Sequence, residues 1–244
     1  MRRAVRLLGT LLIAGGALLL VWVVIVWQWE DPFTAIYTHF EQARLSRDYN
    51  KRVASFHPKL RPSPTGHRDL AAVEREVAAE ARAYGRTLHT GDPVGRIQIG
   101  RIGLKMVVVQ GTDEETLKKG PGHYLTSGLP GEGKLIYIAG HRTTYLAPFA
   151  AINAIRIGDY VKLDMPYGDF TYRVTRHYIV PADELSILVN HNREILRLQA
   201  CHPRFFATHR YIVDARLVAV VPRGGRAYTL AAANRLPSTT RARS

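Results

Sequence analysis

The fold class is decided by Tyr160-Val161-Lys162-Leu163-Asp164-Met165, followed by Pro166-Tyr167-Gly168-Asp169 and then Phe170-Thr171-Tyr172-Arg173-Val174. Apolar and polar residues alternate on both sides of a short segment that contains proline and glycine. Alternation with a period of two is typical of a strand with one buried face. Proline and glycine favour the turn between two such strands. The stretch therefore predicts a β-hairpin with strands at 160–165 and 170–180.

Five further runs of the same kind lie before and after this hairpin. They predict strands at 95–99, 104–109, 134–139, 195–200 and 210–221. Seven short strands with little helix between them predict either a closed β-barrel or a β-sandwich. Thr112-Asp113-Glu114-Glu115 matches a capping box, which predicts a short helix that runs to Lys119.

The N-terminal segment predicts a membrane anchor. Three arginines lie within residues 1–6, and residues 7–27 are a run of 21 residues without a charge. A helix of that length spans a hydrocarbon core of about 30 Å. Tryptophans at 22, 27 and 29 favour the membrane interface, and no small-residue cleavage site follows them. The arginines place the N-terminus in the cytoplasm and the remainder of the chain outside the cell.

Between the anchor and the strands the sequence predicts helices. Spacing of three and four residues predicts one at 33–47, and strong propensity predicts another at 70–84, with a proline-containing spacer at 57–67 between them. These helices form either a solvated stalk or a cover for the β domain. We expect a basic cytoplasmic segment at 1–6, a membrane helix at 7–27, a helical stalk or linker at 28–91, a β domain at 92–222 and a basic disordered tail at 223–244.

The net charge of +14 suggests a nucleic-acid-binding protein until it is divided along the chain. The three N-terminal arginines and five arginines from Arg223 onward account for eight of these charges, and +6 remains for the rest. No basic patch with interleaved aromatic residues supports nucleic-acid recognition. A modestly basic body fits an anionic membrane or cell wall better, so we expect no nucleic-acid partner.

Cys201 is the only cysteine, and its neighbourhood suggests chemistry. It ends the apolar alternating run from Ile195, while His141 follows the run 135–139 and Arg210 opens the last strand. A thiol, an imidazole and a guanidinium at strand ends can supply a nucleophile, an acid/base and an oxyanion donor. The alternative is a buried core cysteine, which is the commonest place for a free thiol.

Four separate motifs, in order, now give the chain a family resemblance. They are Gly95 to Leu104, the loop Gly120-Pro121-Gly122-His123-Tyr124 with Leu129-Pro130-Gly131-Glu132, Ala139-Gly140-His141-Arg142-Thr143-Thr144, and Leu198-Gln199-Ala200-Cys201-His202-Pro203 with Arg210-Tyr211-Ile212-Val213. Together they resemble the sortases, cysteine transpeptidases of Gram-positive cell surfaces. The His-Arg-Thr-Thr and Cys-His-Pro forms look most like the class E sortases of actinobacteria.

The resemblance implies a fold and a mechanism. The fold is mainly β, a closed sortase-type barrel of about eight strands with short helices, preceded by the membrane helix and the stalk. Cys201 attacks the threonine carbonyl of a C-terminal sorting signal, of LPXTG or LAXTG type, and the bond to glycine breaks. His141 is the acid/base, and Arg210 holds the oxyanion or positions the substrate backbone. The resemblance implies no cofactor and no metal.

Further residues are assigned to substrate binding by the same resemblance. Gln199 and Ala200 precede the nucleophile, and Ala200 occupies a position where the family usually has a threonine beside the nucleophile and the substrate. Arg142 and Thr143 follow His141 into a loop, where they either shape the pocket or only form the turn. His123 either borders the groove or packs within its own loop. Residues 186–191 correspond to the loop that cradles the sorting signal. His202 and His209 are expected at the rim, since neighbours along a strand point to opposite faces.

The expected partners are surface proteins with a C-terminal sorting signal, the membrane, and an amine of a peptidoglycan precursor or of a pilin. Three alternatives were weighed. A pilin-polymerising sortase differs only in its lysine acceptor, and a non-catalytic sortase-like module is favoured only by Ala200. The L,D-transpeptidases place the cysteine in a Ser-His-Gly-Cys context, which residues 199–203 do not match. The pentamer 236–240 resembles a sorting signal but lacks the glycine and the apolar segment that should follow.

Overall fold

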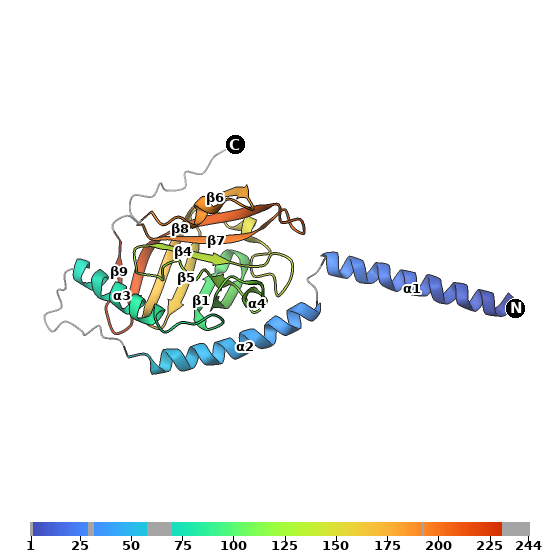
Figure 1. Cartoon of the computed structure of the whole chain (residues 1–244), viewed down its shortest axis with the longest axis horizontal. Coiled ribbons are helices and arrows are strands. Elements are labelled where there is room, and N and C mark those ends of the chain that lie inside the picture. Colours follow the sequence, from blue (N-terminus) through green and yellow to red (C-terminus); the bar gives the residue numbers. More distant parts are fainter. Residues whose placement is uncertain (1, 29–31, 58–69, 192, 231–244) are drawn as a thin grey trace.

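The computed structural model of the chain describes residues 2–28, 32–57, 70–191 and 193–230. Three helices come first in the sequence, and a β domain follows them (Figure 1). The helices are α1 (Arg2–Gln28), α2 (Pro32–Ser55), α3 (Leu70–Gly85) and the short α4 (Glu114–Leu117). The strands are β1 (Pro93–Ile99), β2 (Leu104–Gln110), β3 (Gly122–His123), β4 (Leu135–Ala139), β5 (Tyr160–Met165), β6 (Gly168–Pro181), β7 (Ile195–His202), β8 (His209–Pro222) and β9 (Tyr228–Thr229). Three 3₁₀ turns connect strands: η1 (Gly100–Ile102), η2 (Ile152–Ala154) and η3 (Leu185–Leu188).

Eight of the strands close into a barrel. Their order around it is β6-β5-β1-β2-β3-β4-β7-β8, and pairing of β8 with β6 completes the ring. Most neighbours are antiparallel, but β2 pairs with β3 and β4 pairs with β7 in parallel. The closed eight-stranded barrel with short helices confirms the predicted fold class and excludes the sandwich.

The hairpin at 160–180 forms as its pattern predicts. Strands β5 and β6 pair from Tyr160 to Met165, with Met165 opposite Gly168, so the turn consists of the two residues between them. Val161, Leu163 and Phe170 are almost completely buried inside the barrel. The same alternation places Leu198 of β7 in the core and its neighbours on the outer face. The apolar period of the sequence therefore fixes which side chains point into the barrel.

Helix α2 packs along the outside of the barrel, so of the two alternatives it fits a cover for the β domain and not a solvated stalk. Tyr49 is completely buried and its hydroxyl donates to the carbonyl of Asp164 at 2.7 Å. Gln42 donates to the carbonyls of Val107 (3.0 Å) and Lys119 (2.7 Å), and its side-chain oxygen accepts from the Val107 amide (2.8 Å). These contacts anchor α2 to β2, β5 and the segment after α4. The helix is thus part of the folded body.

Helix α3 also packs into the fold, although it was expected in the stalk. Val77, Ala81 and Tyr84 belong to the barrel's main hydrophobic core. The Tyr84 hydroxyl donates to the carbonyl of Val94 at 2.9 Å, which ties the end of α3 to β1. The expected proline-containing spacer at 57–67 lies outside the described residues, except for its first residue, His57.

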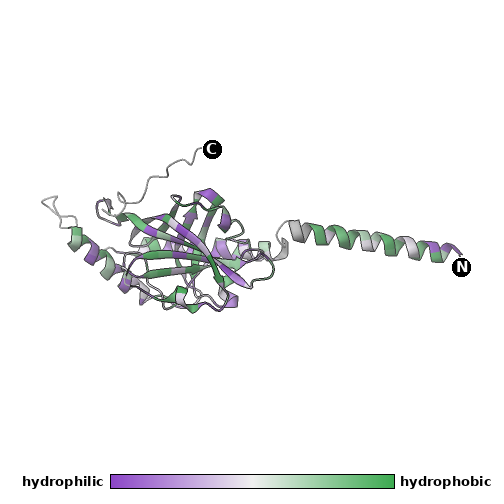
Figure 2. Cartoon of the chain, turned by 90° about the horizontal axis from the view of Figure 1, so that it is seen from above, coloured by the Kyte–Doolittle hydropathy of each residue, from purple (hydrophilic) through white to green (hydrophobic). Residues whose placement is uncertain are grey.

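Helix α1 is long and apolar enough to cross a membrane. Its candidate span runs from Arg2 to Val24, and the barrel covers none of it. Figure 2 shows hydrophobic residues along much of the helix and hydrophilic residues at its N-terminal end. A membrane anchor and an N-terminal signal sequence share these properties, and the orientation across a membrane stays a prediction.

Some boundaries differ from those expected. The N-cap of α4 is Asp113, whose carboxylate accepts from the Thr116 amide at 3.0 Å, and the helix ends at Leu117. Strand β3 is only two residues long and gives no readable period. Strand β9 lies within the expected disordered tail and pairs with β8, because Tyr228 packs against the core. The pentamer at 236–240 lies outside the described residues.

Candidate functional site

A parallel strand pair brings His141 and Cys201 together. In the register of β4 and β7, Ala139 lies opposite Gln199, and the amide of Gly140 donates to the Gln199 carbonyl at 3.0 Å. His141 and Cys201 each lie two residues beyond this pair, so both side chains fall on the same face of the sheet. Gly140 leaves room for Phe149, because a Cβ there would lie only 2.7 Å from the phenyl ring.

The neighbouring antiparallel strand adds Arg210. Strands β7 and β8 pair so that Cys201 lies directly opposite Arg210. Directly opposed residues have Cβ atoms about 4.5–5.5 Å apart and share one face of the sheet. Two residues separated by nine positions in the sequence therefore become neighbours across one hairpin.

The three side chains line one cavity of about 300 Å³ on the outer face of β4, β7 and β8. The residues around it come from six segments of the chain. They are Thr112, Leu117, Tyr124, Tyr137, Ala139, Gly140, His141, Leu188, Gln199, Cys201 and Arg210. The cavity therefore has a polar end with a thiol, an imidazole and a guanidinium, and an apolar wall.

His141 is held in a state suited to accept a proton. Burial lowers the pKa of its imidazole below the ordinary value of 6.5, so the ring is neutral at pH 7. Its Nε2 is buried and has no hydrogen-bond partner among the residues that the structure describes. The Tyr145 ring packs against it with centroids 5.2 Å apart. The imidazole is thus oriented by a ring contact and keeps one nitrogen for chemistry.

Arg210 is fixed through one of its nitrogens. Its Nη1 donates to the carbonyl of Ala207 (2.7 Å), in the connection between β7 and β8, and to that of His209 (3.1 Å), the first residue of β8. A guanidinium presents five N–H donors in a rigid plane. Anchoring by Nη1 leaves donors that a substrate oxygen in the cavity can use.

Gln199 lies in the cavity, as its assignment to substrate binding requires. The Tyr137 hydroxyl donates to its side-chain oxygen at 2.7 Å. Tyr137, Ala139 and His141 are alternate residues of β4 and the segment after it, as Gln199 and Cys201 are in β7. Sequence reasoning missed Tyr137, although its spacing of four residues from His141 carries the signal.

Arg142 differs from the expected pocket-shaping role, because it is buried beneath the nucleophile's strand. Its Nη1 donates to the carbonyl of Cys201 (3.2 Å) and contacts Nδ1 of His202 (3.0 Å), and its Nη2 donates to Asn153 (2.8 Å). Arg142 does not line the cavity. Thr143 follows it, half-buried and also away from the cavity wall.

His123 was expected to border the groove, but it is 2% exposed and bonded on both ring nitrogens. Its Nδ1 lies 2.8 Å from the side-chain oxygen of Gln110, and its Nε2 lies 2.9 Å from the Gly128 carbonyl. The next residue, Tyr124, lines the cavity instead. Consecutive residues of an extended segment face opposite sides, so His123 points into the fold while Tyr124 points into the cavity.

Ala200 was expected beside the nucleophile and the substrate, but it is completely buried in the barrel core. Strand alternation explains the difference, since Gln199 and Cys201 face outward and the residue between them faces inward. Ala200 was the only residue that favoured a non-catalytic module, and its burial in the core removes that support.

The segment expected to cradle the substrate contributes through η3. Leu188 lines the cavity, and Ile187 packs against Tyr137 on the outer face of the sheet. Arg197 holds η3 in place by donating to the Ile187 carbonyl, and a bidentate pair with Asp214 (2.6 and 2.9 Å) fixes its guanidinium. Sequence reasoning missed Arg197, although it alternates with Gln199 and Cys201 on the same face.

The two histidines next to the catalytic candidates lie outside the cavity wall. Nδ1 of His202 faces the Arg142 guanidinium, and burial together with this positive charge lowers the pKa of His202. His209 is exposed, and its Nδ1 lies 2.9 Å from the Thr208 hydroxyl. Neither ring is positioned to replace His141.

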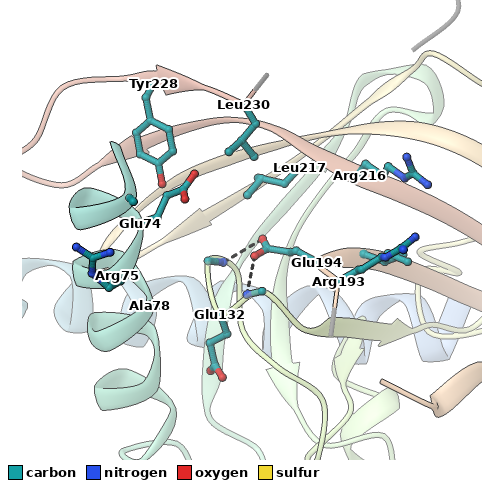
Figure 3. Close-up of a pocket in the computed structure, with 14 residues that line it drawn as sticks. Glu74, Arg75, Ala78, Glu132, Arg193, Glu194, Arg216, Leu217, Tyr228 and Leu230 are labelled. Carbon is teal, nitrogen blue, oxygen red and sulfur yellow. Dashed lines mark hydrogen bonds between the residues drawn. The ribbon is translucent and has the colours of Figure 1, made fainter. Parts of the chain in front are cut away.

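A second cavity, of about 740 Å³, lies between α3 and the strands at the far end of β7 (Figure 3). Glu194 is its central acidic group. Figure 3 shows that carboxylate bonded to the loop below it, where it accepts from the amides of Gly131 and Gly133 at 3.0 Å each. The Tyr172 hydroxyl donates to it as well, at 2.6 Å. Because the chain itself satisfies Glu194, this cavity offers a structural carboxylate and none of the candidate catalytic groups.

Comparisons with known proteins agree with this geometry. The family model described as the sortase domain matches residues 97–218, which is half of the chain. Sortase D of Bacillus subtilis (strain 168) is 36% identical over 133 residues, which are 53% of this chain and 66% of that protein, just under two thirds of its length.

Two solved structures show the same fold. The Clostridium perfringens sortase D5 transpeptidase has a TM-score of 0.51 and 24% identity, over 60% of this chain and 99% of that chain. Sortase E1 from Streptomyces coelicolor, solved with a tripeptide in its active site, has a TM-score of 0.51 and 22% identity, over 55% of this chain and 92% of that chain.

Proposed function

The chain belongs to the sortase family, and on that premise we propose that it is a membrane-anchored cysteine transpeptidase. It cleaves a C-terminal sorting signal between threonine and glycine and joins the threonine carbonyl to an amine of the cell wall. The observation that carries the proposal is the shared cavity in which Cys201, His141 and Arg210 meet. Those three residue types suffice for acyl transfer through a thioester.

The first half-reaction begins with a proton transfer. Nε2 of neutral His141 takes the proton of the Cys201 thiol, and the thiolate attacks the threonine carbonyl carbon. When the tetrahedral intermediate collapses, the bond to the glycine nitrogen breaks and His141 returns the proton to that leaving amine. The products are a thioester on Cys201 and a peptide that begins with glycine. Burial of His141 favours this role, because its lowered pKa keeps the ring neutral before the thiol proton arrives.

The second half-reaction reverses these roles. An acceptor amine attacks the thioester carbonyl and gives a proton to His141. The carbon–sulfur bond then breaks, Cys201 leaves as the thiolate, and His141 reprotonates it. A new amide joins the signal's threonine to the acceptor, and the enzyme regains its starting state.

Arg210 stabilises the oxyanion of both tetrahedral intermediates. It lies across the strand pair from Cys201, and its guanidinium stays charged throughout the cycle. Donors that are already in place when negative charge develops lower the barrier without reorganisation. Anchoring of Nη1 by Ala207 and His209 provides that preorganisation.

The proposed substrate is an LPXTG-type signal, with LAXTG the preferred variant. Leu117, Tyr137 and Leu188 supply an apolar wall for the signal's leucine, and Gln199 supplies a side-chain amide for its backbone. The preference for LAXTG follows from the class E resemblance of the His-Arg-Thr-Thr and Cys-His-Pro motifs. The proposed acceptor is an amine of a peptidoglycan precursor.

The proposed location is the outer face of the cell membrane. Helix α1 supplies one membrane span, with Arg2, Arg3 and Arg6 on the cytoplasmic side. The catalytic barrel is then extracellular. An uncleaved anchor keeps the enzyme where sorting-signal proteins and wall precursors cross the membrane.

The test uses the full chain in detergent micelles, because a fragment that begins at Leu70 would lose α2 and its contacts with the barrel. The protein is incubated with quenched LPXTG and LAXTG peptides, with and without an amine, and the intact mass is measured. We expect a threonine-linked adduct on Cys201, which becomes an amide product when the amine is present. Cys201→Ala is the control and must form neither.

The proposal fails if a folded protein whose thiol reacts with iodoacetamide forms no adduct with either peptide. A greater yield of adduct from LPXTG than from LAXTG would reject only the proposed signal preference.

A further inference from the structure

The most exposed large apolar side chains of the barrel and α2 belong to three segments. Outside α1, five described residues of this kind exceed all the others in exposed fraction. They are Ile36 (57%), Phe40 (70%), Leu185 (70%), Phe205 (56%) and Phe206 (77%). They come from the start of α2, from η3 and from the connection between β7 and β8. Single exposed apolar residues are common, but a group of them marks a contact surface.

All three segments lie at the end of the barrel that holds Cys201. Leu188 at the end of η3 lines the catalytic cavity. The connection between β7 and β8 begins directly after the cysteine strand, and Arg204 within it reaches the Arg142 carbonyl at 3.5 Å. Figure 1 shows that α2 begins at the same end of the barrel.

The start of α2 is in contact with the catalytic histidine's loop. The Tyr145 amide donates to the Thr34 hydroxyl at 3.2 Å, and the rings of Tyr37 and Tyr145 meet edge to face at 6.5 Å. Tyr145 in turn packs against His141. The N-terminal end of α2 therefore lies at the same end of the barrel as His141.

The short connection between α1 and α2 keeps the N-terminal end of α2 close to the apolar helix α1. Helix α1 ends at Gln28 and α2 begins at Pro32. Four Cα–Cα steps reach at most about 14 Å when fully extended. The first turns of α2, with Ile36 and Phe40 exposed, are therefore held close to wherever α1 leaves a bilayer.

We propose that the five residues Ile36, Phe40, Leu185, Phe205 and Phe206 form a docking face that rests on the membrane. This inference builds on the membrane anchor proposed above. The occupant is the interface of a phospholipid bilayer, a layer about 5–7 Å deep on each side of the hydrocarbon core. Phenylalanine rings enter that layer, and the exposed Arg204 beside them meets lipid phosphates.

The docking face places the mouth of the catalytic cavity at the height of the lipid headgroups. The enzyme then selects peptide bonds that are presented next to the bilayer over those displayed far above it.

The test reads membrane depth at two positions of the full chain. Cys201→Ala removes the only native thiol, and Phe206→Cys or Arg226→Cys supplies a single site for an environment-sensitive fluorophore. Arg226 is exposed after β8, at the barrel end opposite Cys201. Each labelled protein is reconstituted into vesicles of phosphatidylcholine and phosphatidylglycerol that contain a lipid with a nitroxide near its headgroup.

We expect strong quenching at position 206 and little at position 226. Adding Ile36→Ser and Phe40→Ser to the position-206 protein should reduce that quenching, because two of the anchoring side chains are lost. Equal and weak quenching at both positions, in protein that floats with the vesicles, would overturn the docking face and leave the anchor intact. Protein that does not float would reject the anchor, and the docking face with it. Vesicles of phosphatidylcholine alone show whether the apolar side chains suffice without anionic lipid.

Discussion

Arg142 Nη1 lies 3.2 Å from the carbonyl oxygen of Cys201, to which it donates a hydrogen bond. The side chain next to His141 thus holds the backbone of Cys201. The same guanidinium contacts His202 and Asn153, so it connects the loop after β4 to the end of β7. Arg142 is a positioning residue that the substrate does not touch.

Replacing Arg142 should therefore slow the chemistry more than it weakens substrate binding. We expect Arg142→Gln to lower kcat by about 10²-fold, the usual cost of a displacement of about 1 Å between reacting groups. KM should change little, because Arg142 does not line the cavity. Steady-state kinetics with the preferred peptide measures both. Asn153→Ala is the matched control, since it removes one partner of Arg142 and keeps the bond to Cys201. An unchanged kcat in Arg142→Gln would contradict the positioning role.

Arg210 should stabilise the transition state through the N–H donors of its guanidinium. We expect Arg210→Lys to lower kcat by about 10²–10³-fold, the range measured when one oxyanion donor is removed. The rate of thiol alkylation by iodoacetamide should fall far less, since that reaction forms no oxyanion. Arg216→Lys, an exposed substitution in the same strand, is the control. Equal losses in acylation and alkylation would show that Arg210 acts on the thiol instead.

Ala200→Thr should cost stability without raising activity. The side chain is completely buried among packed core residues, and added volume there costs about 1–3 kcal/mol of unfolding free energy. The new hydroxyl would point into the core and away from the cavity. Urea denaturation and peptide turnover measure the two effects. A stable variant with faster turnover would show that position 200 acts on the substrate after all.

His123 should make the fold sensitive to acid. Burial lowers its pKa in the folded state below the ordinary 6.5, so the unfolded chain binds the proton more tightly. The contribution of His123 to stability is therefore present above pH 6.5 and is lost as the pH falls below it. We expect the midpoint of thermal unfolding to depend less on pH between 7 and 5 in His123→Gln than in the native chain. The exposed His191→Gln is the control, and an unchanged slope in His123→Gln would contradict the prediction.

Gln42 should carry much of the attachment of α2. Its three hydrogen bonds are to backbone groups of the barrel, and each contributes about 0.5–1.5 kcal/mol. We expect Gln42→Ala to lower the free energy of unfolding by about 2–4 kcal/mol, given those values. Arg44→Ala, exposed on the same helix, should change it little. Similar stability of both variants would mean that apolar burial alone holds the helix.

The sequence predicted the strands because apolar and polar residues alternate along most of them, and the resemblance to the sortases favoured a closed barrel over a sandwich. The residues at 160–165 and 195–200 carry a period of two, and their inward and outward faces appear in the structure as that period requires. Strands β3 and β9 escaped prediction because two residues carry no period. The packing of α2 was not predicted, because the residues that pack against Val107 and Val109 extend beyond the predicted helix at 33–47. They are Leu45, Tyr49 and Val53, spaced four apart.

The sequence predicted the site residues that strand pairing brings together. It did not predict the residues for which a shift of one position along the strand changes the side chain from the outer face to the inner face. Cys201, His141, Arg210 and Gln199 lie in the cavity because each lies near one end of a strand, on the outer face. His123 and Ala200 are buried, and in each case it is the next residue, Tyr124 or Cys201, that lines the cavity. Arg142 could not be placed from its sequence neighbours, because its partners lie 59 to 60 positions away and in a separate turn.

The register of β4 and β7 has a consequence for how this enzyme can be changed. The positions of His141 and Cys201 relative to each other are set by one residue pair, Ala139 opposite Gln199. The chain that connects the two strands does not set them. The segment between η3 and Glu194 can therefore be lengthened, shortened or exchanged while thiol and imidazole keep their distance. New peptide specificities can be grafted into this enzyme as insertions, whereas a single residue added within either strand would turn its catalytic group toward the core.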